Sequence, residues 1–260
     1  MRASDLDFAL SLADDADALS LPRFRAADLR VETKPDLTPV TDADTAVERA
    51  LRERIARERP GEGVLGEEEG DSGGPSAGGG VFRAGGGGFA DAAPTHVRWI
   101  IDPIDGTKNF ARGIPVWATL IALERDGEIV CGVASAPALG HRWWAARGEG
   151  AYRDGERLHV SKIARLEEAT VSCSHARDLA RFEDVVRHAR NFGDFWQHML
   201  VAEGAVDVAI DDALVLWDVA VVESIVREAG GRVDRLPNGQ TVSSNGRLHD
   251  AAFSRFAKPG

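Results

Sequence analysis

The chain of 260 residues is 43% apolar and 28% charged, which is usual for a soluble globular protein with a substantial core. Lys and Arg number 31 against 42 Asp and Glu, and the formal net charge of −11 argues against a nucleic-acid partner. No run approaches the ~18 apolar residues of a membrane helix, and the N-terminal residues lack the pattern of a signal peptide. Cys131 and Cys173 are too few for a disulfide scaffold, so we expect a protein of the reducing cytoplasm.

The first 60 residues predict two amphipathic helices separated by a loop. Apolar residues recur at helical spacing over residues 4–20, with aspartates between them. Two prolines and two threonines at 34–41 indicate a loop. A second helix is expected over residues 42–59, because the Pro60-Gly61 pair that follows ends helices.

Residues 70–96 differ in composition from the sequence on either side. Ten of these 27 residues are glycine and few are large and apolar, so the segment loses much chain entropy on ordering and buries little surface. Well-patterned sequence resumes on both sides. We therefore expect a flexible insertion rather than a boundary between domains.

The rest of the sequence alternates between predicted strands and helices. A strand is expected at 97–101, and two hairpins are expected at 120–137 and 142–160, which turn at Asp126-Gly127 and Asp154-Gly155. Further strands are expected at 169–173 and 205–210, and helices at 176–190, 195–203 and 217–229. Meandering strands followed by alternating elements predict two layered subdomains, residues 1–145 and 146–260.

The segment WIIDPIDGTKNF, residues 99–110, places two aspartates at the end of an apolar strand. Asp102 ends the strand and Asp105 follows three residues later, and the proline between them forbids a ladder hydrogen bond, so we expect the strand to stop there. Both carboxylates and the intervening carbonyls can then converge on one point. Oxygen ligands with no His or Cys nearby suit Mg²⁺ before Zn²⁺. Gly106 allows the backbone to approach a ligand, and Thr107 adds a hydroxyl and an amide donor.

Two other interpretations of this segment compete with a metal site. An Asp-Gly turn whose aspartates accept hydrogen bonds from local amides would have the same residues. A phosphatase of the haloacid-dehalogenase type has a nucleophilic aspartate with its acid two residues later. Here the spacing is three with a proline between, which favours metal ligation.

Other acidic residues also lie where predicted elements begin or end. Glu67 and Glu68 follow a short apolar run, Asp218 opens the helix at 217–229, and Asp42 and Asp44 open the helix at 42–59. Each position has a simpler interpretation, because runs of glutamate are usually solvated and aspartate is a preferred helix cap. Their function depends on whether the fold brings them to the Asp102 segment.

Four segments together resemble the signatures of the inositol monophosphatase family of Mg²⁺-dependent, lithium-sensitive phosphatases. They are KPDLTPVTDADTAVE at 34–48, VLGEE at 64–68, WIIDPIDGTKNF at 99–110 and LWDVAVVESIVREAGG at 216–231. The resemblance covers nearly the whole chain and implies a layered αβαβα sandwich, an α/β fold of the inositol-monophosphatase and fructose-bisphosphatase type. Two features depart from the pattern: residues 70–96 replace a short connection, and Glu69 stands where Ser or Thr is frequent.

The resemblance implies two to three Mg²⁺ ions in each active site. By match to the family's motifs, Glu67, Asp102 and the carbonyl of Ile104 would hold the first ion. Asp102, Asp105 and Asp218 would hold the second, and a third, looser ion would lie near Glu67. The first subdomain would then carry most of the metal ligands, and the second would carry Asp218 and the residues that select the substrate.

The resemblance also implies the residues that act on water and phosphate. Asp44 and Thr107 match the pair that orients the attacking water together with Glu67, and no covalent phospho-enzyme is expected. The amides of Gly106 and Thr107 match the phosphate cradle. Lys34 lies where the family has a mobile metal-binding loop, and it either contacts phosphate or is solvated.

Within the family, the phrases LTPVTDAD, DGTKNFARGIPVW and SAPALGHRWWAARGEGA look most like the actinobacterial branch of histidinol-phosphate phosphatases. Asp211 falls where inositol phosphatases carry a glutamate that touches the sugar, and Asp194 falls where a small polar residue is frequent. Two carboxylates facing a leaving group would suit the amine and imidazole of L-histidinol better than a neutral polyol. Surface charge is the simpler interpretation of both.

The reaction expected is hydrolysis of L-histidinol phosphate to L-histidinol and phosphate, a step of histidine biosynthesis. The alternatives are an inositol-1-phosphate phosphatase and a non-catalytic binding protein, which the complete set of expected metal ligands disfavours. Because the family is commonly dimeric, we expect a homodimer with a small phosphate ester as its partner, and neither nucleic acid nor membrane.

Overall fold

A computed structural model of the chain describes residues 4–35, 37–72 and 96–257. The expected flexible insertion at 70–96 lies outside the described residues except at its two ends. At the first end, Gly70–Ser72 form a short strand, β4, that pairs with β3. At the second end, the amide of His96 donates to the Asp126 carboxylate at 3.0 Å.

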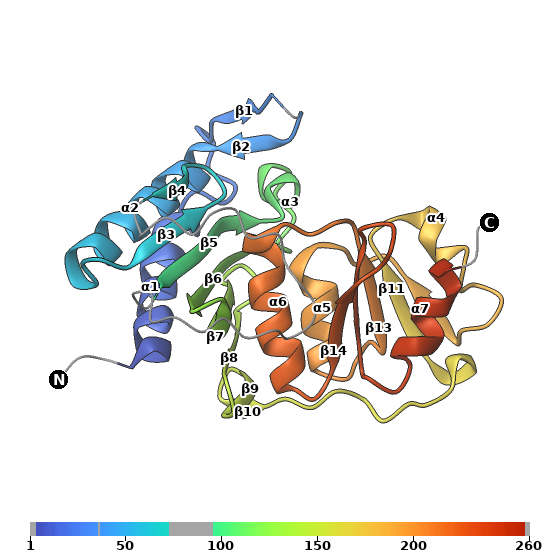
Figure 1. Cartoon of the computed structure of the whole chain (residues 1–260). Helices are drawn as coiled ribbons and strands as arrows, with labels where there is room; N and C mark the ends of the chain where they lie inside the picture. Colours follow the sequence, from blue (N-terminus) through green and yellow to red (C-terminus); the bar gives the residue numbers. More distant parts are fainter. Residues whose placement is uncertain (1–3, 36, 73–95, 258–260) are drawn as a thin grey trace.

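The described chain forms alternating layers of helix and sheet (Figure 1). The helices are α1 (Asp5–Ser20), α2 (Asp42–Glu58), α3 (Thr107–Ala111), α4 (Ala176–Leu179), α5 (Asp194–Ala202), α6 (Leu216–Glu228) and α7 (His249–Ala257). Helices α1 and α2 cover one face of the first sheet, and α5 and α6 lie between the two sheets. Helices α4 and α7 pack on the second sheet. This is the predicted αβαβα sandwich.

The first sheet has eight strands in the order β10-β9-β8-β7-β6-β5-β3-β4. Its strands are β3 (Gly63–Gly66), β4, β5 (Val97–Asp105), β6 (Ala118–Arg125), β7 (Glu128–Ala136), β8 (His141–Ala146), β9 (Gly150–Arg153) and β10 (Glu156–Arg157). Neighbours are antiparallel except β3 and β5, which run parallel. The predicted turns at 126–127 and 154–155 are confirmed, since both aspartates and both glycines have positive φ.

The second sheet has five strands in the order β12-β11-β13-β15-β14. Its strands are β11 (Thr170–Cys173), β12 (His188–Arg190), β13 (Val208–Asp211), β14 (Arg232–Arg235) and β15 (Thr241–Ser244). Strand β11 is parallel to both of its neighbours, and the others pair antiparallel. A separate hairpin joins β1 (Val31–Thr33) to β2 (Pro39–Thr41) and projects beyond α2 (Figure 1).

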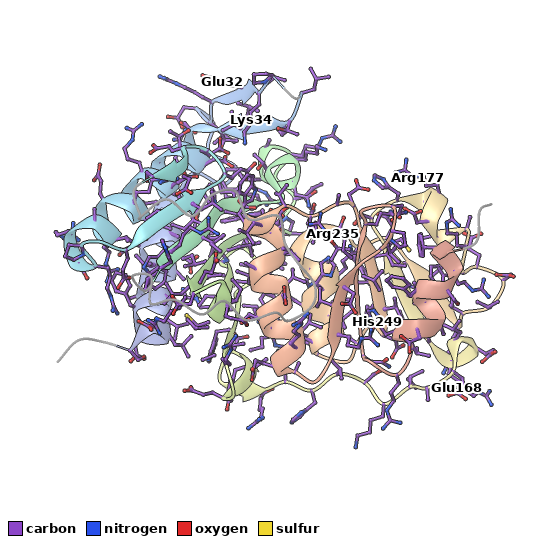
Figure 2. All side chains as sticks on the ribbon, viewed as in Figure 1. Glu32, Lys34, Glu168, Arg177, Arg235 and His249 are labelled. Carbon is purple, nitrogen blue, oxygen red and sulfur yellow. The ribbon has the colours of Figure 1, made fainter. Side chains whose placement is uncertain are left out.

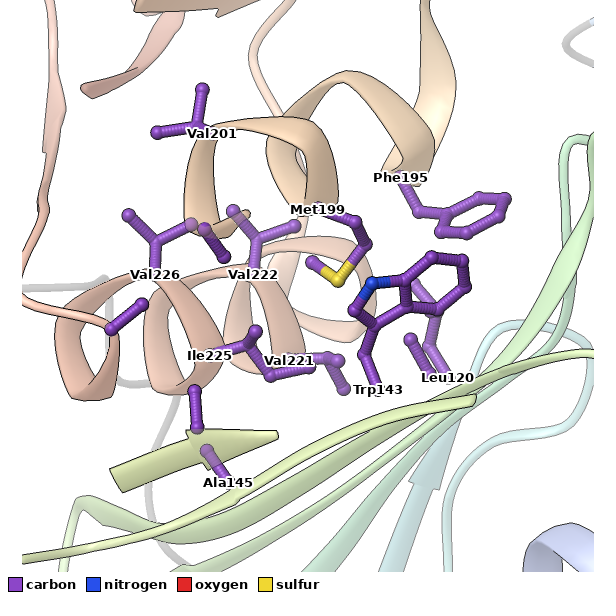
Figure 3. Packing of buried hydrophobic residues seen from close by; sticks show 14 of the residues in the cluster. Leu120, Trp143, Ala145, Phe195, Met199, Val201, Val221, Val222, Ile225 and Val226 are labelled. Carbon is purple, nitrogen blue, oxygen red and sulfur yellow. The ribbon is translucent and has the colours of Figure 1, made fainter. Parts of the chain in front are cut away.

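Apolar packing between the sheets fixes α5 and α6 (Figure 3). Trp143 of β8 is 1% exposed, its ring lies edge-on to Phe195 of α5 at 5.9 Å, and Met199, Val221 and Ile225 pack in the same cluster. Full burial of such a side chain contributes roughly 1.5–3 kcal/mol. The cluster therefore holds the first turns of both helices rigidly against the sheet that carries β5.

Two elements expected from the sequence need correction. The helix expected at 176–190 ends at Leu179, because residues 188–190 pair with β11 and Phe182 turns into the core of the second half, so tertiary contacts override helix propensity. The loop expected at 34–41 is a turn whose last three residues, Pro39–Thr41, form β2. The first sheet continues to Arg157, and the division into subdomains 1–145 and 146–260 stays a prediction.

Within the part of the chain that the structure describes, no helix is both long enough and apolar enough to cross a bilayer.

Candidate active site

A bulge in β5 brings the two aspartates of the DPID segment to one side of the sheet. Side chains alternate along a regular strand, so residues three apart point to opposite faces. The strand does not stop at Pro103 as expected: Asp102 pairs with Leu120, the register then shifts, and Asp105 pairs with Ala118. The extra residue in the bulge reverses the alternation, and the carboxylates of Asp102 and Asp105 converge.

Asp218 completes this cluster from the first turn of α6. One carboxylate oxygen from each of Asp102, Asp105 and Asp218 lies within 4.8 Å of the other two. Asp218 does not cap its helix, because the N-cap is Val215 and no side chain accepts there. The simpler interpretation of Asp218 as a cap is therefore wrong, and its carboxylate is directed at the other two.

Burial and mutual repulsion make it unfavourable for all three carboxylates to be ionised when no cation is bound. Burial, then repulsion from Glu67, raises the pKa of Asp102 well above its usual range, and burial with repulsion from Asp194 does the same for Asp105. Burial and the charge of Glu67 raise the pKa of Asp218 to about 7. Like-charged, oxygen-only donors that are buried or half-buried and lie this close together fit a hard divalent cation.

Glu67 follows β3, beside β5, and its backbone amide donates to the Ile101 carbonyl at 3.2 Å. The ammonium group of Lys34, at the end of the β1–β2 hairpin (Figure 2), contacts Glu67 at 2.8 Å and Glu68 at 2.7 Å. Lys34 is therefore not solvated as one interpretation held. It places a positive charge against the carboxylate that the resemblance assigns to the first ion.

Asp44 and Thr107 meet as the resemblance implied. The N-cap Thr41 and Asp44 form a capping box at the start of α2, in which the Thr41 amide donates to Asp44 Oδ2 at 2.9 Å. The second carboxylate oxygen lies 3.2 Å from the Thr107 hydroxyl, which is also 2.9 Å from the Ile104 carbonyl. Burial raises the pKa of Asp44 to about 6. Capping and the proposed catalytic role therefore belong to the same side chain.

The start of α5 adjoins the acidic cluster. The amide of Phe195 donates to Asp105 Oδ2 at 2.7 Å, and Asp194 has a positive φ of 49°, an uncommon conformation that aspartate tolerates. Asp194 Oδ2 accepts a hydrogen bond of 2.8 Å from Asn109 and lies 3.5 Å from where a Cβ would stand on Gly106. Asp194 is thus beside the proposed phosphate cradle rather than on an open surface.

Asp211 is 7% exposed and ends β13. Its carboxylate accepts from the Asp212 amide at 2.8 Å and from Gln197 at 2.9 Å, and His198 lies at 3.4 Å. Although burial opposes it, hydrogen bonding and charge from His198 lower the pKa of Asp211. Asp211 is a buried anion with internal partners, so the interpretation as surface charge is wrong for it too.

Sequence reasoning missed the residues that hold these side chains. Asn109 bridges Asp194 and the Val116 carbonyl, and Gln197 and His198 approach Asp211 from α5. Two charged residues of α2, Glu48 and Arg52, are buried behind Glu67. Hydrophobic spacing could not signal any of them, because a polar residue in a sequence gives no sign that another segment buries it.

The raised pKa values predict how stability depends on pH without metal. Asp102, Asp105 and Asp218 bind protons more tightly in the folded chain than in the unfolded chain, so their stabilising contribution is full below about pH 4. It is lost as pH rises through their raised pKa values, of which that of Asp218 is about 7. In EDTA we expect Tm at pH 5.5 to exceed Tm at pH 8 by about 5 °C or more. Saturating Mg²⁺ should raise Tm at pH 8 and shrink that difference. Thermal unfolding at both pH values tests this, and a Tm in EDTA that falls on acidification would contradict it.

Comparison with known proteins agrees with this geometry. The model of the inositol monophosphatase family matches residues 2–258, so the chain belongs to that family. A histidinol-phosphatase of Mycobacterium tuberculosis is 48% identical over 276 residues, which cover 98% of this chain and 99% of that protein. A histidinol-phosphatase of Streptomyces coelicolor is 45% identical, with 95% and 94% covered. The predicted family membership and its actinobacterial branch are confirmed.

The fold is confirmed by solved structures. The structure described as an IMPase of Thermotoga maritima superposes with a TM-score of 0.82, at 31% sequence identity, with 98% of this chain and 97% of that chain covered. The layered arrangement expected from the sequence is therefore that of a known phosphatase fold.

Proposed function

We propose that this chain is a Mg²⁺-dependent histidinol-phosphatase, a phosphoric monoester hydrolase that converts L-histidinol phosphate to L-histidinol and phosphate. The observation that carries the proposal is the Asp102–Asp105–Asp218 cluster, one buried and two half-buried carboxylates, in a chain 48% identical to a histidinol-phosphatase over nearly its whole length. The first ion would be held by Glu67, Asp102 and the Ile104 carbonyl, and the second by the three aspartates. When bound, Mg²⁺ would lower the pKa of a water and would neutralise charge on the phosphate and the leaving oxygen.

The side chains around the metal site would orient the water and the ester. The Thr107 hydroxyl donates a hydrogen bond to Asp44, which would leave an oxygen lone pair of Thr107 to accept a hydrogen bond from the attacking water. The amides of Gly106 and Thr107 begin α3 and would donate to phosphate oxygens. No side chain would act as a nucleophile in this mechanism, because water would attack phosphorus directly and in line with the leaving oxygen.

The negative charge beyond the metal cluster supports a cationic leaving group. Asp194 lies beside Gly106, and Asp211 is a buried anion of lowered pKa on the neighbouring strand β13. An amine or imidazolium group gains from such charge, whereas a neutral polyol gains little. Inositol 1-phosphate is the second candidate substrate, since a Thermotoga maritima IMPase shares the fold at 31% identity.

A phosphate-release assay on the purified protein tests the proposal. With Mg²⁺ present we expect kcat/KM for L-histidinol phosphate to exceed that for inositol 1-phosphate at least about tenfold, a difference of ~1.4 kcal/mol, and EDTA should abolish both activities. The reverse preference would identify an inositol phosphatase. Absence of activity on every ester would leave a non-catalytic binding protein. The homodimer and the cytoplasmic location stay predictions, which sedimentation and cell fractionation can check.

Replacing Asp194 and Asp211 with asparagine tests the leaving-group assignment. Loss of a charged hydrogen bond costs roughly 1.5–3 kcal/mol, so kcat/KM for histidinol phosphate should fall about ten- to a hundredfold. The larger loss is expected for Asp194→Asn, because Asp211 already has internal donors. An aryl phosphate should be hydrolysed almost as before. Equal losses on both substrates would mean that these carboxylates support the metal site or the fold instead.

A further inference from the structure

Helix α2 carries a buried ion pair that the proposed reaction does not use. Glu48 and Arg52 are spaced like a solvent-exposed pair one helical turn apart, but Glu48 is 0% exposed and Arg52 is 8% exposed. Burying two charges is expensive unless both are fully hydrogen bonded, so their partners should explain why they are there. The same helix presents Asp44 one turn before Glu48.

The Glu48 carboxylate binds the backbone that follows Glu67. One of its oxygens accepts from the Glu68 amide at 2.8 Å. The other accepts from the Glu69 amide at 2.9 Å and from Arg52 Nε at 2.9 Å. Two consecutive amides directly after the proposed metal ligand are thus held by a single buried carboxylate.

Arg52 binds the backbone on both sides of the same segment. Its guanidinium donates to the Val64 carbonyl at 3.3 Å, before Glu67, and to the Gly70 carbonyl, after it. The planar fork of donors suits this kind of backbone contact. Together, the pair fixes the chain from residue 64 to residue 70 on α2.

Gly66, next to Glu67, shows how close this contact is. A Cβ at position 66 would stand 2.2 Å from one Glu48 carboxylate oxygen and 2.7 Å from the other, although the glycine has no positive φ that would itself require the residue. The absence of a side chain therefore makes room for the Glu48 carboxylate. The sequence and the packing both indicate that the chain at Gly66 forms a binding position for the Glu48 carboxylate.

We propose that Glu48 is a positioning residue for the metal ligand Glu67. With Arg52 it ties the backbone around Glu67 to α2, and because Asp44 is on the same helix, it sets where the Glu67 carboxylate stands relative to the water-orienting Asp44. The inference rests on the proposed function, since it gives Glu67 a metal to bind. Residues that orient metal ligands typically change metal affinity or activity about 10–100-fold when they are replaced.

Glu48→Gln is the sharpest test, because it keeps the size of the side chain. Both oxygens of Glu48 face N–H donors, so an amide group must point its own N–H bonds at one of them. We expect calorimetry on the metal-free protein to show Mg²⁺ affinity lowered about tenfold or more. The Mg²⁺ concentration for half-maximal phosphatase activity should rise by a similar factor.

Ile55→Val is the matched control, since Ile55 is a buried apolar residue of the same helix that packs in the apolar cluster with Leu12, Leu51 and Trp99. It should lower Tm while Mg²⁺ affinity stays as in the wild type. If Glu48→Gln likewise lowers Tm but leaves Mg²⁺ affinity unchanged, Glu48 merely stabilises the fold and the inference is overturned.

Arg52→Lys keeps the test decisive if Glu48→Gln does not fold. It preserves the charge but loses the fork that holds both carbonyls, so Mg²⁺ affinity should fall at least about threefold, by the same loss of ligand orientation. Unchanged affinity in this variant would overturn the inference. If the wild-type protein itself binds no Mg²⁺, the proposed function is overturned as well. Failure of the inference about Glu48 and failure of the proposed function therefore give different results.

Discussion

Asp102→Asn is expected to lower kcat at least about a thousandfold, or ~4 kcal/mol, the largest effect of any single replacement of a metal ligand. Asp102 is the one carboxylate assigned to both ions, and it is 2% exposed. An asparagine oxygen can still accept from the Ile104 amide, which now donates to Asp102 at 2.9 Å, so the bulge should persist. Steady-state phosphate release at saturating Mg²⁺ measures the loss. More than about a tenth of the wild-type kcat would refute the two-ion assignment.

The same variant should be more stable than the wild type when no metal is bound. Burial and neighbouring charges raise the pKa of Asp102, so its ionised form destabilises the metal-free fold at pH 8. We expect a higher Tm than wild type in EDTA and little further rise with Mg²⁺. Asp178→Asn is a matched control, because Asp178 is also buried but binds Gln240 in the second half of the chain. It should keep its Mg²⁺-dependent rise in Tm and nearly full activity.

Local signals in the sequence predict much of the fold and part of the site. Helices α1 and α2 follow from apolar spacing, and α2 also from the Pro-Gly pair that ends it. The Asp126-Gly127 turn follows because Asp and Gly tolerate the positive φ angles that the turn requires. Such signals act over a few residues and do not depend on the rest of the chain. The acidic motifs could be recognised for the same reason, since each is contiguous.

The features that sequence reasoning missed depend on distant contacts. Residues 176–190 have the composition of a helix, yet pairing of β12 with β11 decides their conformation. The bulge at Asp102–Asp105 exists in the pairing of β5 with β6 and is not visible in β5 alone. Glu48 looks like half of a solvated pair until the loop after β3 is placed over it. Polar residues buried by another segment are those for which local patterns carry no information.

Asp44→Asn is expected to lower kcat by about two to four orders of magnitude with little change in Tm. The Thr107 hydroxyl has one proton and two acceptors, Asp44 and the Ile104 carbonyl. Donation to Asp44 leaves the Thr107 oxygen free to accept from water. An asparagine that keeps its oxygen on the Thr41 amide would turn its N–H bonds toward Thr107 and occupy that lone pair. Because the pKa of Asp44 is raised to about 6, loss of its charge should cost the fold little.

Variants at Thr107 separate this orientation effect from a loss of metal. Thr107→Ser keeps the hydroxyl and should retain most activity, whereas Thr107→Val removes it at equal size and should lose about as much kcat as Asp44→Asn. If both groups act on one water, the double variant should be hardly slower than either single variant. Mg²⁺ affinity measured by calorimetry should stay near that of the wild type in all of them. Additive losses in the double variant, or a matching loss of Mg²⁺ binding, would show that Asp44 supports the metal site and does not orient water through Thr107.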